Sequence, residues 1–157
     1  MAEIVEAKTK SRVASAKRLV KEYSASLGID LGFESFDREM ADFPGAYARP
    51  AGRLLLAIEK GDATGVVALR KLSENTCEMK RLYVRPDFRG KGIGRELATR
   101  VIQEARGIGY ARMRLDTLSS LKEAVSLYKS LGFRRIAPYR FNPHEGVIYM
   151  ELTLKAK

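Results

Sequence analysis

The stretch from Cys77 to Arg106 holds the residues of this sequence whose types and spacing best suit a chemical site. A strand-like run ends at Val84, a turn follows, and Arg89-Gly90-Lys91-Gly92-Ile93-Gly94-Arg95 opens directly onto an amphipathic helical pattern. The first turn of a helix leaves backbone N–H groups without intrahelical partners, and the helix dipole adds about half a positive charge there. Glycines let an anion approach that backbone closely because they lack a Cβ. The run therefore predicts an anion site, reinforced by three basic side chains and best suited to two adjacent phosphates.

The pattern of glycines narrows the kind of phosphate ligand. A P-loop needs a Lys-Ser/Thr pair after its last glycine, which this run lacks, and a dinucleotide-binding fingerprint needs a third glycine where Leu97 stands. The run instead matches R-x-x-G-x-G, filled by Arg89, Gly92 and Gly94. Here the chain resembles the GCN5-related N-acetyltransferase (GNAT) superfamily, whose loop of this form holds the pyrophosphate of acetyl-coenzyme A (acetyl-CoA). For the loop taken alone, a mobile surface turn is the alternative.

A second pattern extends the resemblance, because residues Ala124 to Phe133 match A-x-x-L-Y-x-x-x-G-F without a gap. In the family the tyrosine of this pattern, here Tyr128, gives a proton to the leaving thiolate of coenzyme A. The alternative is that Tyr128 is one more buried residue of an amphipathic helix. Family members often carry an asparagine three residues before the alanine, where this chain has Leu121. The polar contact expected from that asparagine would then come from other groups, such as Asp116 and Thr117 at the end of the preceding strand.

The resemblance also assigns roles to the strand before the loop. Backbone N–H groups at Leu82, Tyr83 and Val84 are expected to bind the thioester and the pantetheine arm, with a β-bulge that splays this strand from its neighbour. Glu78 occupies the position of a catalytic glutamate in the histone-modifying branch of the family. A carboxylate half-buried in a cleft has a raised pKa, which suits it to deprotonate the amine directly or through water. The alternatives for Glu78 are substrate positioning and an ion pair with Lys80 or Arg81.

Three further residues are expected on the acceptor side of the cleft. In the resemblance, region 31–43 lies over the acceptor, so Phe33 is a candidate for substrate contact, with core packing as the alternative. Tyr139 and Asn142, in a Pro-containing loop near the C-terminus, are the other two candidates. The sequence shows no metal-ligand spacing, and no metal is expected.

Hydrophobic periodicity predicts the elements that position these residues. Strands are predicted at 3–7, 53–59, 64–72, 76–84, 111–117, 133–136 and 147–154, and helices at 11–27, from about 35, at 93–106 and at 120–131. A hairpin turn at Lys60-Gly61-Asp62 indicates that the strands between 53 and 84 form an antiparallel meander. This succession predicts one α+β (mixed α/β) domain over residues 1–157. It matches the GNAT order of elements, which implies a mostly antiparallel sheet of six or seven strands flanked by about four helices.

The composition limits the class of protein. With 157 residues, of which 45% are hydrophobic and 31% charged, the chain fits one globular domain. No apolar run is long enough for a membrane span, the N-terminus lacks a signal-peptide core, and the single Cys77 cannot form an internal disulfide, so the cytoplasm is the expected location. The net charge of +10 invites nucleic-acid binding, but the basic residues are spread through the predicted elements. This spread favours attraction of an anionic cofactor over nucleic-acid binding.

Three functions follow from these observations. The first is an acetyl-CoA-dependent N-acetyltransferase, in which a primary amine of a small molecule, amino acid, peptide or protein attacks the thioester directly in a ternary complex. The second is a non-catalytic acyl-CoA-binding module or sensor, and the third is a basic nucleic-acid-binding protein. The presence of both Glu78 and Tyr128 favours the enzyme over the module. The acceptor amine and the formation of a homodimer stay open.

Overall fold

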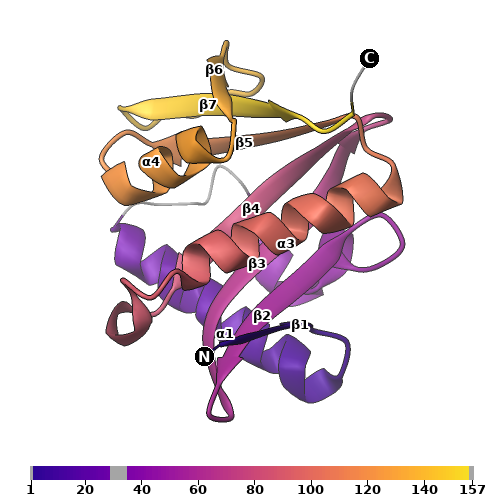
Figure 1. The fold of residues 1–157 in the computed structure, drawn as a ribbon, viewed down its shortest axis with the longest axis vertical. Helices are drawn as coiled ribbons and strands as arrows, with labels where there is room; N and C mark the ends of the chain where they lie inside the picture. The colour runs from indigo at the N-terminus through magenta and orange to yellow at the C-terminus, as the bar shows by residue number, and fades with distance from the viewer. Residues whose placement is uncertain (1, 29–34, 156–157) are drawn as a thin grey trace.

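A seven-stranded sheet forms the centre of the computed structural model, which describes residues 2–28 and 35–155. The strand order is β1-β2-β3-β4-β5-β7-β6 (Figure 1). The strands are β1 Glu3–Glu6, β2 Arg53–Glu59, β3 Asp62–Ser73, β4 Thr76–Val84, β5 Arg112–Leu118, β6 Arg134–Ile136 and β7 Val147–Thr153. β4 and β5 pair in parallel, and the other neighbours pair antiparallel. The predicted α+β fold with a mostly antiparallel sheet is confirmed.

Helices lie on both faces of this sheet. They are α1 Lys10–Leu27, α2 Phe36–Asp42, α3 Ile93–Ile108 and α4 Lys122–Ser130, with 3-10 turns η2 Gly45–Tyr47 and η3 Pro86–Phe88. In the view of Figure 1, α3 crosses the front of the sheet and α1 lies behind it. None of the helices in residues 2–28 and 35–155 combines the length and apolar composition needed to cross a bilayer.

The helix ends follow local signals. The Thr9 side chain accepts a hydrogen bond from the backbone N–H of Arg12 at 3.2 Å and caps the start of α1, which ends at Gly28 with a φ of 66°. α3 was expected to end at Arg106 but continues through Gly107 to Ile108. It stops at Gly109, whose φ of 112° turns the chain out of the helix. α4 begins at Lys122, two residues later than expected.

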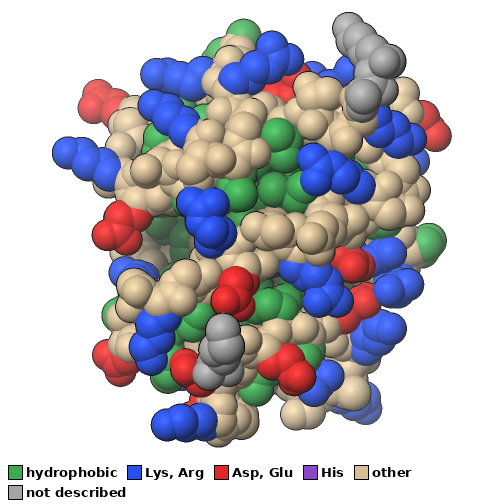
Figure 2. Space-filling model, in the orientation of Figure 1, with side chains coloured by type: hydrophobic (Ala, Val, Ile, Leu, Met, Phe, Trp, Pro, Cys, Tyr) green, Lys and Arg blue, Asp and Glu red, His purple; other side chains and the backbone are tan. Residues whose placement is uncertain are grey.

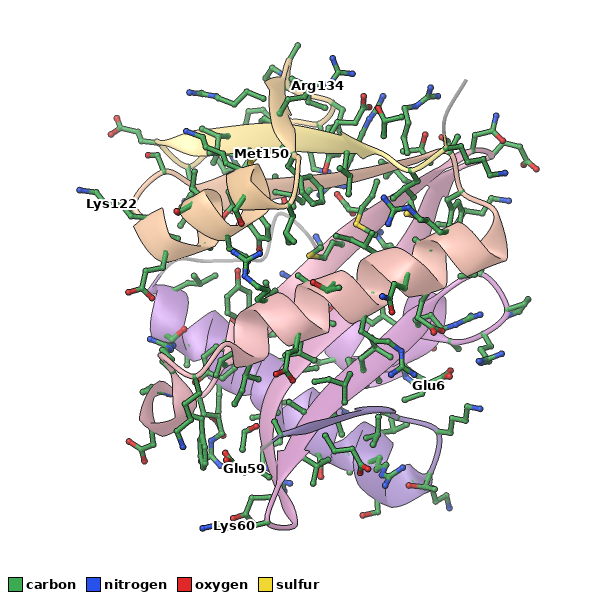
Figure 3. The ribbon with its side chains drawn as sticks, viewed as in Figure 1. Glu6, Glu59, Lys60, Lys122, Arg134 and Met150 are labelled. Carbon is green, nitrogen blue, oxygen red and sulfur yellow. The ribbon has the colours of Figure 1, made fainter. Side chains whose placement is uncertain are left out.

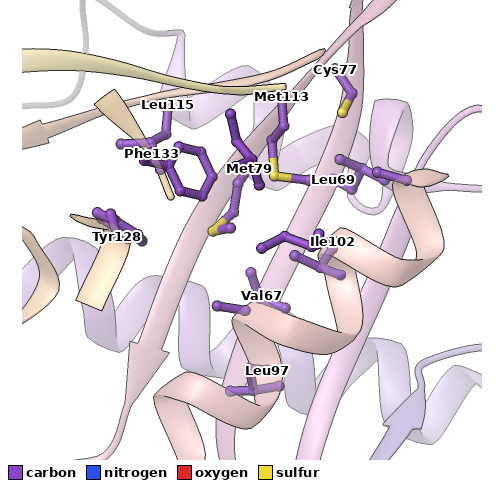
Figure 4. Close-up of a cluster of buried hydrophobic side chains, with 14 of the residues drawn as sticks. Val67, Leu69, Cys77, Met79, Leu97, Ile102, Met113, Leu115, Tyr128 and Phe133 are labelled. Carbon is purple, nitrogen blue, oxygen red and sulfur yellow. The ribbon is translucent and has the colours of Figure 1, made fainter. Parts of the chain in front are cut away.

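Two hydrophobic cores result from this layering. The first lies between the sheet and the α3–α4 layer, and its fully buried members include Leu69, Leu97 and Met113 (Figure 4). The second packs α1 and α2 against β2 and β3 on the opposite face. On that opposite face β4, β5 and β7 carry charged side chains instead, and Arg140 of the loop 137–146 contacts two of them, Glu78 on β4 and Asp116 on β5.

Candidate active site

The two parallel strands at the centre of the sheet separate after three residue pairs. β4 and β5 pair from Thr76 with Arg112 to Glu78 with Arg114, where their ladder ends. On the β3 side, Val66 faces Tyr83 and Ala68 faces Lys80, so two β4 residues stand opposite a single β3 residue. This register shift is a β-bulge at Arg81 and Leu82, which bends β4 away from β5. The bulge and the splay implied by the resemblance are therefore confirmed.

An ion pair from α2 braces the bulge. Arg81 has a φ of 62°, in the left-handed region that non-glycine residues rarely adopt. Its guanidinium donates to both oxygens of Glu39 at 2.7 and 3.2 Å and lies 5.4 Å from the ring centre of Phe36. Glu39 also accepts a hydrogen bond from the Tyr47 hydroxyl at 2.8 Å. Arg81 was expected to pair with Glu78. It pairs with Glu39 instead, and this pair holds α2 against the bent strand.

A pocket of about 550 Å³ lies beside the C-terminal end of β4 and the glycine loop 89–94. Eight of the residues predicted to bind the cofactor line it, namely Leu82, Tyr83, Val84, Arg89, Gly90, Gly92, Ile93 and Gly94. Figure 2 views the face that carries α3 and shows hydrophobic side chains between α3 and α4, with Lys and Arg side chains around them. We call the pocket of about 550 Å³ the outer pocket.

The N-termini of two helices border the outer pocket. Gly92, with a φ of 83°, is the N-cap of α3, and Leu121 is the N-cap of α4. Lys122, the first residue of α4, is labelled in Figure 3. The first turn of a helix has backbone N–H groups without intrahelical partners and carries the positive end of the helix dipole, and residues of both helix starts line the pocket. The Arg89 Nε donates to the Val84 carbonyl at 2.9 Å, which holds its guanidinium beside the same space. The arrangement suits a ligand that carries more than one phosphate.

Two of the predicted cofactor residues, Lys91 and Arg95, are absent from the described lining of both pockets. The Lys91 Nζ lies 3.8 Å from Glu59 and 5.4 Å from the ring centre of Phe88. Arg95 donates to the Ser130 hydroxyl at 2.7 Å and so ties α3 to α4. Their contacts with the cofactor remain predictions.

A smaller pocket of about 60 Å³, the inner pocket, lies where β4 and β5 separate. Tyr23, Leu82 and Leu121 line both pockets, so the two spaces adjoin. Tyr128 lines the inner pocket, and its ring packs edge-on against Phe133 with centres 5.7 Å apart (Figure 4). Burial raises the pKa of the Tyr128 hydroxyl, and the nearby Tyr23 and Asp116 raise it further. The phenol therefore stays protonated at neutral pH, as a proton donor must.

Glu78 is fully buried, and its surroundings differ from the expectation. Arg70 Nε lies 2.8 Å from one carboxylate oxygen, while the Tyr139 hydroxyl, at 2.6 Å, and Arg140 donate to the other. Burial raises the pKa of Glu78, but the positive charges of Lys80, Arg140 and Arg70 and the bond from Tyr139 outweigh it, so the pKa is lowered. The expected rise in pKa is wrong, because three cations surround this carboxylate. The expected pairing with the neighbouring Lys80 or Arg81 is replaced by Arg70 and Arg140.

The remaining predicted residues are Thr117, Asn142, Tyr139 and Phe33. Thr117 and Asn142 line the inner pocket. Tyr139 contacts Glu78 and packs against Tyr149 with ring centres 5.2 Å apart, outside the described lining of either pocket. Phe33 lies outside the described residues.

Several site residues had not been predicted. Tyr23, Ser26 and Leu27 in the last turns of α1 line the outer pocket, and Lys80 lines the inner one. Asp116, which the sequence offered with Thr117 as a polar group, also lines the inner pocket. The position of α1 is set by its packing across the sheet, which helical periodicity alone does not reveal. The alternation of β4 and β5 does indicate that Lys80 and Asp116 leave the sheet on the same side as Glu78. Within residues 2–28 and 35–155, no group of three or more His, Cys, Asp or Glu side chains is placed to hold a metal ion.

Comparison with known proteins identifies the family of this chain. The model of the acetyltransferase (GNAT) family matches residues 17–133. An uncharacterized N-acetyltransferase of Schizosaccharomyces pombe is 45% identical over 140 residues, which cover 88% of this chain and 86% of that protein. The N-acetylaspartate synthetase of Danio rerio is 39% identical over 100 residues, which cover 62% of this chain and 36% of that protein.

Solved structures show the same fold. A GNAT-family acetyltransferase from Staphylococcus aureus superposes with a TM-score of 0.81 at 21% identity, over 99% of this chain and 100% of that one. YncA from Salmonella typhimurium, solved with its cofactor acetyl-CoA, superposes with a TM-score of 0.71 at 23% identity, over 100% of this chain and 96% of that one. Because the family model covers well over half of the sequence and the yeast relative nearly all of it, the chain belongs to the GNAT family of acetyltransferases and is an N-acetyltransferase.

Proposed function

We propose that the protein transfers the acetyl group of acetyl-CoA to a primary amine by direct attack in a ternary complex. The observation that carries this proposal is the adjoining of the two pockets through the gap between β4 and β5. The outer pocket, with its two helix N-termini, suits the pyrophosphate and pantetheine of the cofactor. The inner pocket, which Tyr128 lines, suits the thioester and the amine.

The chain supplies a group for each step of this transfer. The amine nitrogen bonds to the thioester carbon, and the carbonyl oxygen becomes an oxyanion. Backbone N–H groups of β4 beyond Glu78, which the splay removes from pairing with β5, are available to stabilise that charge. When the carbon–sulfur bond breaks, the Tyr128 hydroxyl gives its proton to the sulfur. The oxyanion re-forms the carbonyl as this bond breaks. The amine gives up a proton to a base or to water, and a proton returned from solvent restores the Tyr128 hydroxyl.

Two carboxylates compete as the base. Glu78 is ionised at neutral pH because its pKa is lowered, but it lies outside the lining of both pockets, whereas Asp116 lines the inner pocket. If Glu78 is the base, kcat/KM should fall in acid only as Glu78 becomes protonated, which happens below pH 4.5 because its pKa is lowered from that value. Between about pH 5 and 9 we therefore expect kcat/KM to rise with the free-base fraction of the acceptor. An acidic limb inside that range that disappears in Glu78→Gln would contradict this expectation.

The acceptor is proposed to be a small amine, and an amino acid in particular. Four relatives, the N-acetylaspartate synthetases of zebrafish, rat, human and mouse, support this class by their names. The inner pocket of about 60 Å³ also suits a small acceptor. A non-catalytic acyl-CoA sensor would have no need of a buried phenol beside the thioester, and Tyr128 therefore supports the enzyme.

Calorimetric titration with acetyl-CoA tests the cofactor site. We expect Gly92→Glu to weaken binding at least tenfold, because a carboxylate at the N-cap of α3 repels the pyrophosphate at a cost on the order of 1.4 kcal/mol or more. A Cβ at Gly92 meets no atom within 4 Å, so the substitution adds charge without a clash.

Gly61→Glu is the matched control for this titration. Gly61 has a φ of 84° and equally open surroundings, but it lies in the β2–β3 turn and outside the described lining of the outer pocket. The control shares the backbone strain and the added charge, and it should bind acetyl-CoA like the wild type. Equal affinity of Gly92→Glu and wild type would overturn the cofactor assignment.

A further inference from the structure

The β-bulge at Arg81 and Leu82 decides which way the side chains at the end of β4 point. Met79 contacts the core on the α3 side of the sheet, and so does Leu82, three residues later. Regular alternation would send these two side chains to opposite faces. The extra residue of the bulge reverses the alternation, so Tyr83 contacts the core on the α1 side. The course of β4 beside the two pockets therefore depends on this bulge.

The end of β4 is also supported on one edge only. Its ladder with β5 ends at Glu78, and beyond that residue β4 pairs with β3. A segment with fewer backbone hydrogen bonds opens more readily. The proposed function assigns the N–H groups of this segment to the thioester and the pantetheine arm. Their positions must be held by contacts other than a second neighbouring strand.

Arg81 supplies such a contact from the point of greatest bend. Its φ of 62° is unfavourable for a residue that carries a Cβ, and such a conformation persists only where the surroundings hold it. The Arg81 side chain is 4% exposed, and it donates to both carboxylate oxygens of Glu39 at 2.7 and 3.2 Å. Two parallel bonds between charged groups fix the direction of the guanidinium as well as its distance.

The partner of Arg81 is itself held by its neighbours. Only 18% of the Glu39 side chain is exposed, and one of its oxygens also accepts a hydrogen bond from the Tyr47 hydroxyl at 2.8 Å. Tyr47 is buried, and its ring packs edge-on against Phe43 with centres 6.0 Å apart. Phe36 of α2 lies against the Arg81 guanidinium. The bend in β4 is thus tied to α2 and η2 through Glu39.

We infer that Glu39 is a positioning residue for acetyl-CoA, which acts through Arg81 to hold the end of β4 where its backbone N–H groups meet the thioester and the pantetheine arm. This inference rests on the proposed N-acetyltransferase function. Glu39 itself lies outside the described lining of both pockets. A displacement of about 1 Å at a reacting group costs about 100-fold in rate, so a residue outside the pockets acts on the chemical step.

A double variant separates the position of β4 from the stability of the fold. Glu39→Gln alone leaves a buried guanidinium without its anion, so this variant should lose stability. Combining it with Arg81→Gly removes the uncompensated charge, and glycine adopts a φ of 62° without strain. Urea unfolding should therefore show the double variant to be more stable than Glu39→Gln.

Activity should not recover with that stability, because the double variant still lacks the tie between β4 and α2. We expect its kcat to be about 10- to 100-fold below that of the wild type, with a smaller change in KM for the amine, since the N–H groups act on the oxyanion of the transition state. The Kd for acetyl-CoA should rise about 2- to 10-fold, as expected for one weakened hydrogen bond.

Two controls show whether the loss is local. The Kd for 3′-phospho-ADP, the part of coenzyme A without the pantetheine arm, should stay unchanged in the double variant because the glycine loop is intact. Glu104→Gln is the matched variant, because Glu104 lies 2.8 Å from Arg53 and their side chains are 22% and 10% exposed, outside the described lining of both pockets. It should lose stability and keep the kcat and Kd of the wild type.

The outcomes separate this inference from the function on which it rests. A double variant with wild-type kcat and Kd overturns the inference and leaves the N-acetyltransferase standing, as does an equal loss of kcat in Glu104→Gln. If the wild type binds acetyl-CoA and transfers to no amine, the proposed function is overturned, and the Kd of the double variant decides the inference. Where the double variant does not fold, Arg81→Gly alone cuts the tie without leaving a buried cation, and a wild-type kcat and Kd there overturn the inference.

Discussion

Replacement of Tyr128 by Phe is expected to slow acetyl transfer by about 10²- to 10⁴-fold, the range over which general acid–base catalysis acts. The variant keeps the ring and its edge-on contact with Phe133, so the packing of α4 on the sheet is retained. It loses only the hydroxyl, whose raised pKa keeps it protonated beside the inner pocket. Without this proton donor the coenzyme leaves as a bare thiolate, which is a poorer leaving group.

Tyr110→Phe provides the matched control for this experiment. Tyr110 is also buried, but its hydroxyl donates to the Ala51 carbonyl at 2.7 Å, away from both pockets. Its removal should lower stability by about 1 kcal/mol, the usual contribution of one hydrogen bond, and leave the rate unchanged. Tyr128→Phe should show the opposite pattern, with a slow rate and nearly unchanged melting temperature.

Turnover is measured at saturating acetyl-CoA with the best acceptor found among small amines and amino acids. A Tyr128→Phe rate within about twofold of wild type has two explanations, a product release that limits the rate or a thiolate that needs no acid. Single-turnover measurement of the chemical step distinguishes them. An unchanged chemical step would remove Tyr128 from the mechanism.

Glu78→Gln is expected to cost about 3 kcal/mol of the free energy of unfolding at pH 7, a loss of about 150-fold in the folding equilibrium. The carboxylate is fully buried, and its removal leaves Arg140 and Arg70 without their shared anion. We take the low end of the range for a broken buried pair, because 35% of the Arg70 side chain is exposed and water hydrates it.

The effect of Glu78→Gln also depends on pH. The pKa of Glu78 is lowered from 4.5 in the folded chain, so the ionised carboxylate stabilises the fold fully above pH 4.5. That stabilisation is lost as the pH falls below 4.5 toward the folded-state pKa. The difference between Glu78→Gln and wild type should therefore shrink in acid.

Urea unfolding at several pH values measures this difference. The control is Glu74→Gln, whose carboxylate is 87% exposed and pairs with Lys71, because exposed pairs contribute on the order of 0–1 kcal/mol. A Glu78→Gln variant as stable as Glu74→Gln would show that Glu78 does not hold the loop 137–146 to the sheet.

The sequence by itself determined the elements and the cofactor side of the site. Period-two and period-3.6 patterns located the described strands and helices to within about two residues, because each pattern reflects burial of one face of one element. The glycine loop and Tyr128 were also found locally. The conformational freedom of Gly92, at a φ of 83°, and the start of α3 are properties of a few consecutive residues.

Only the tertiary structure showed which side chains surround Glu78, on the side of the site where the acceptor is proposed to bind. Glu78 contacts Tyr139 and Arg140, which lie 61 and 62 positions later in the sequence. The strand register also places Arg114 beside Glu78, and Glu151 beside Arg114. Such contacts depend on which strands are neighbours, and β7 lies between β5 and β6 although it follows both in the chain. The pKa of Glu78 was predicted in the wrong direction for this reason. Burial acts on any carboxylate, but of the three cations that outweigh it only Lys80 is near Glu78 in the sequence. Arg70 comes from β3 and Arg140 from the loop 137–146, and folding brings both to Glu78.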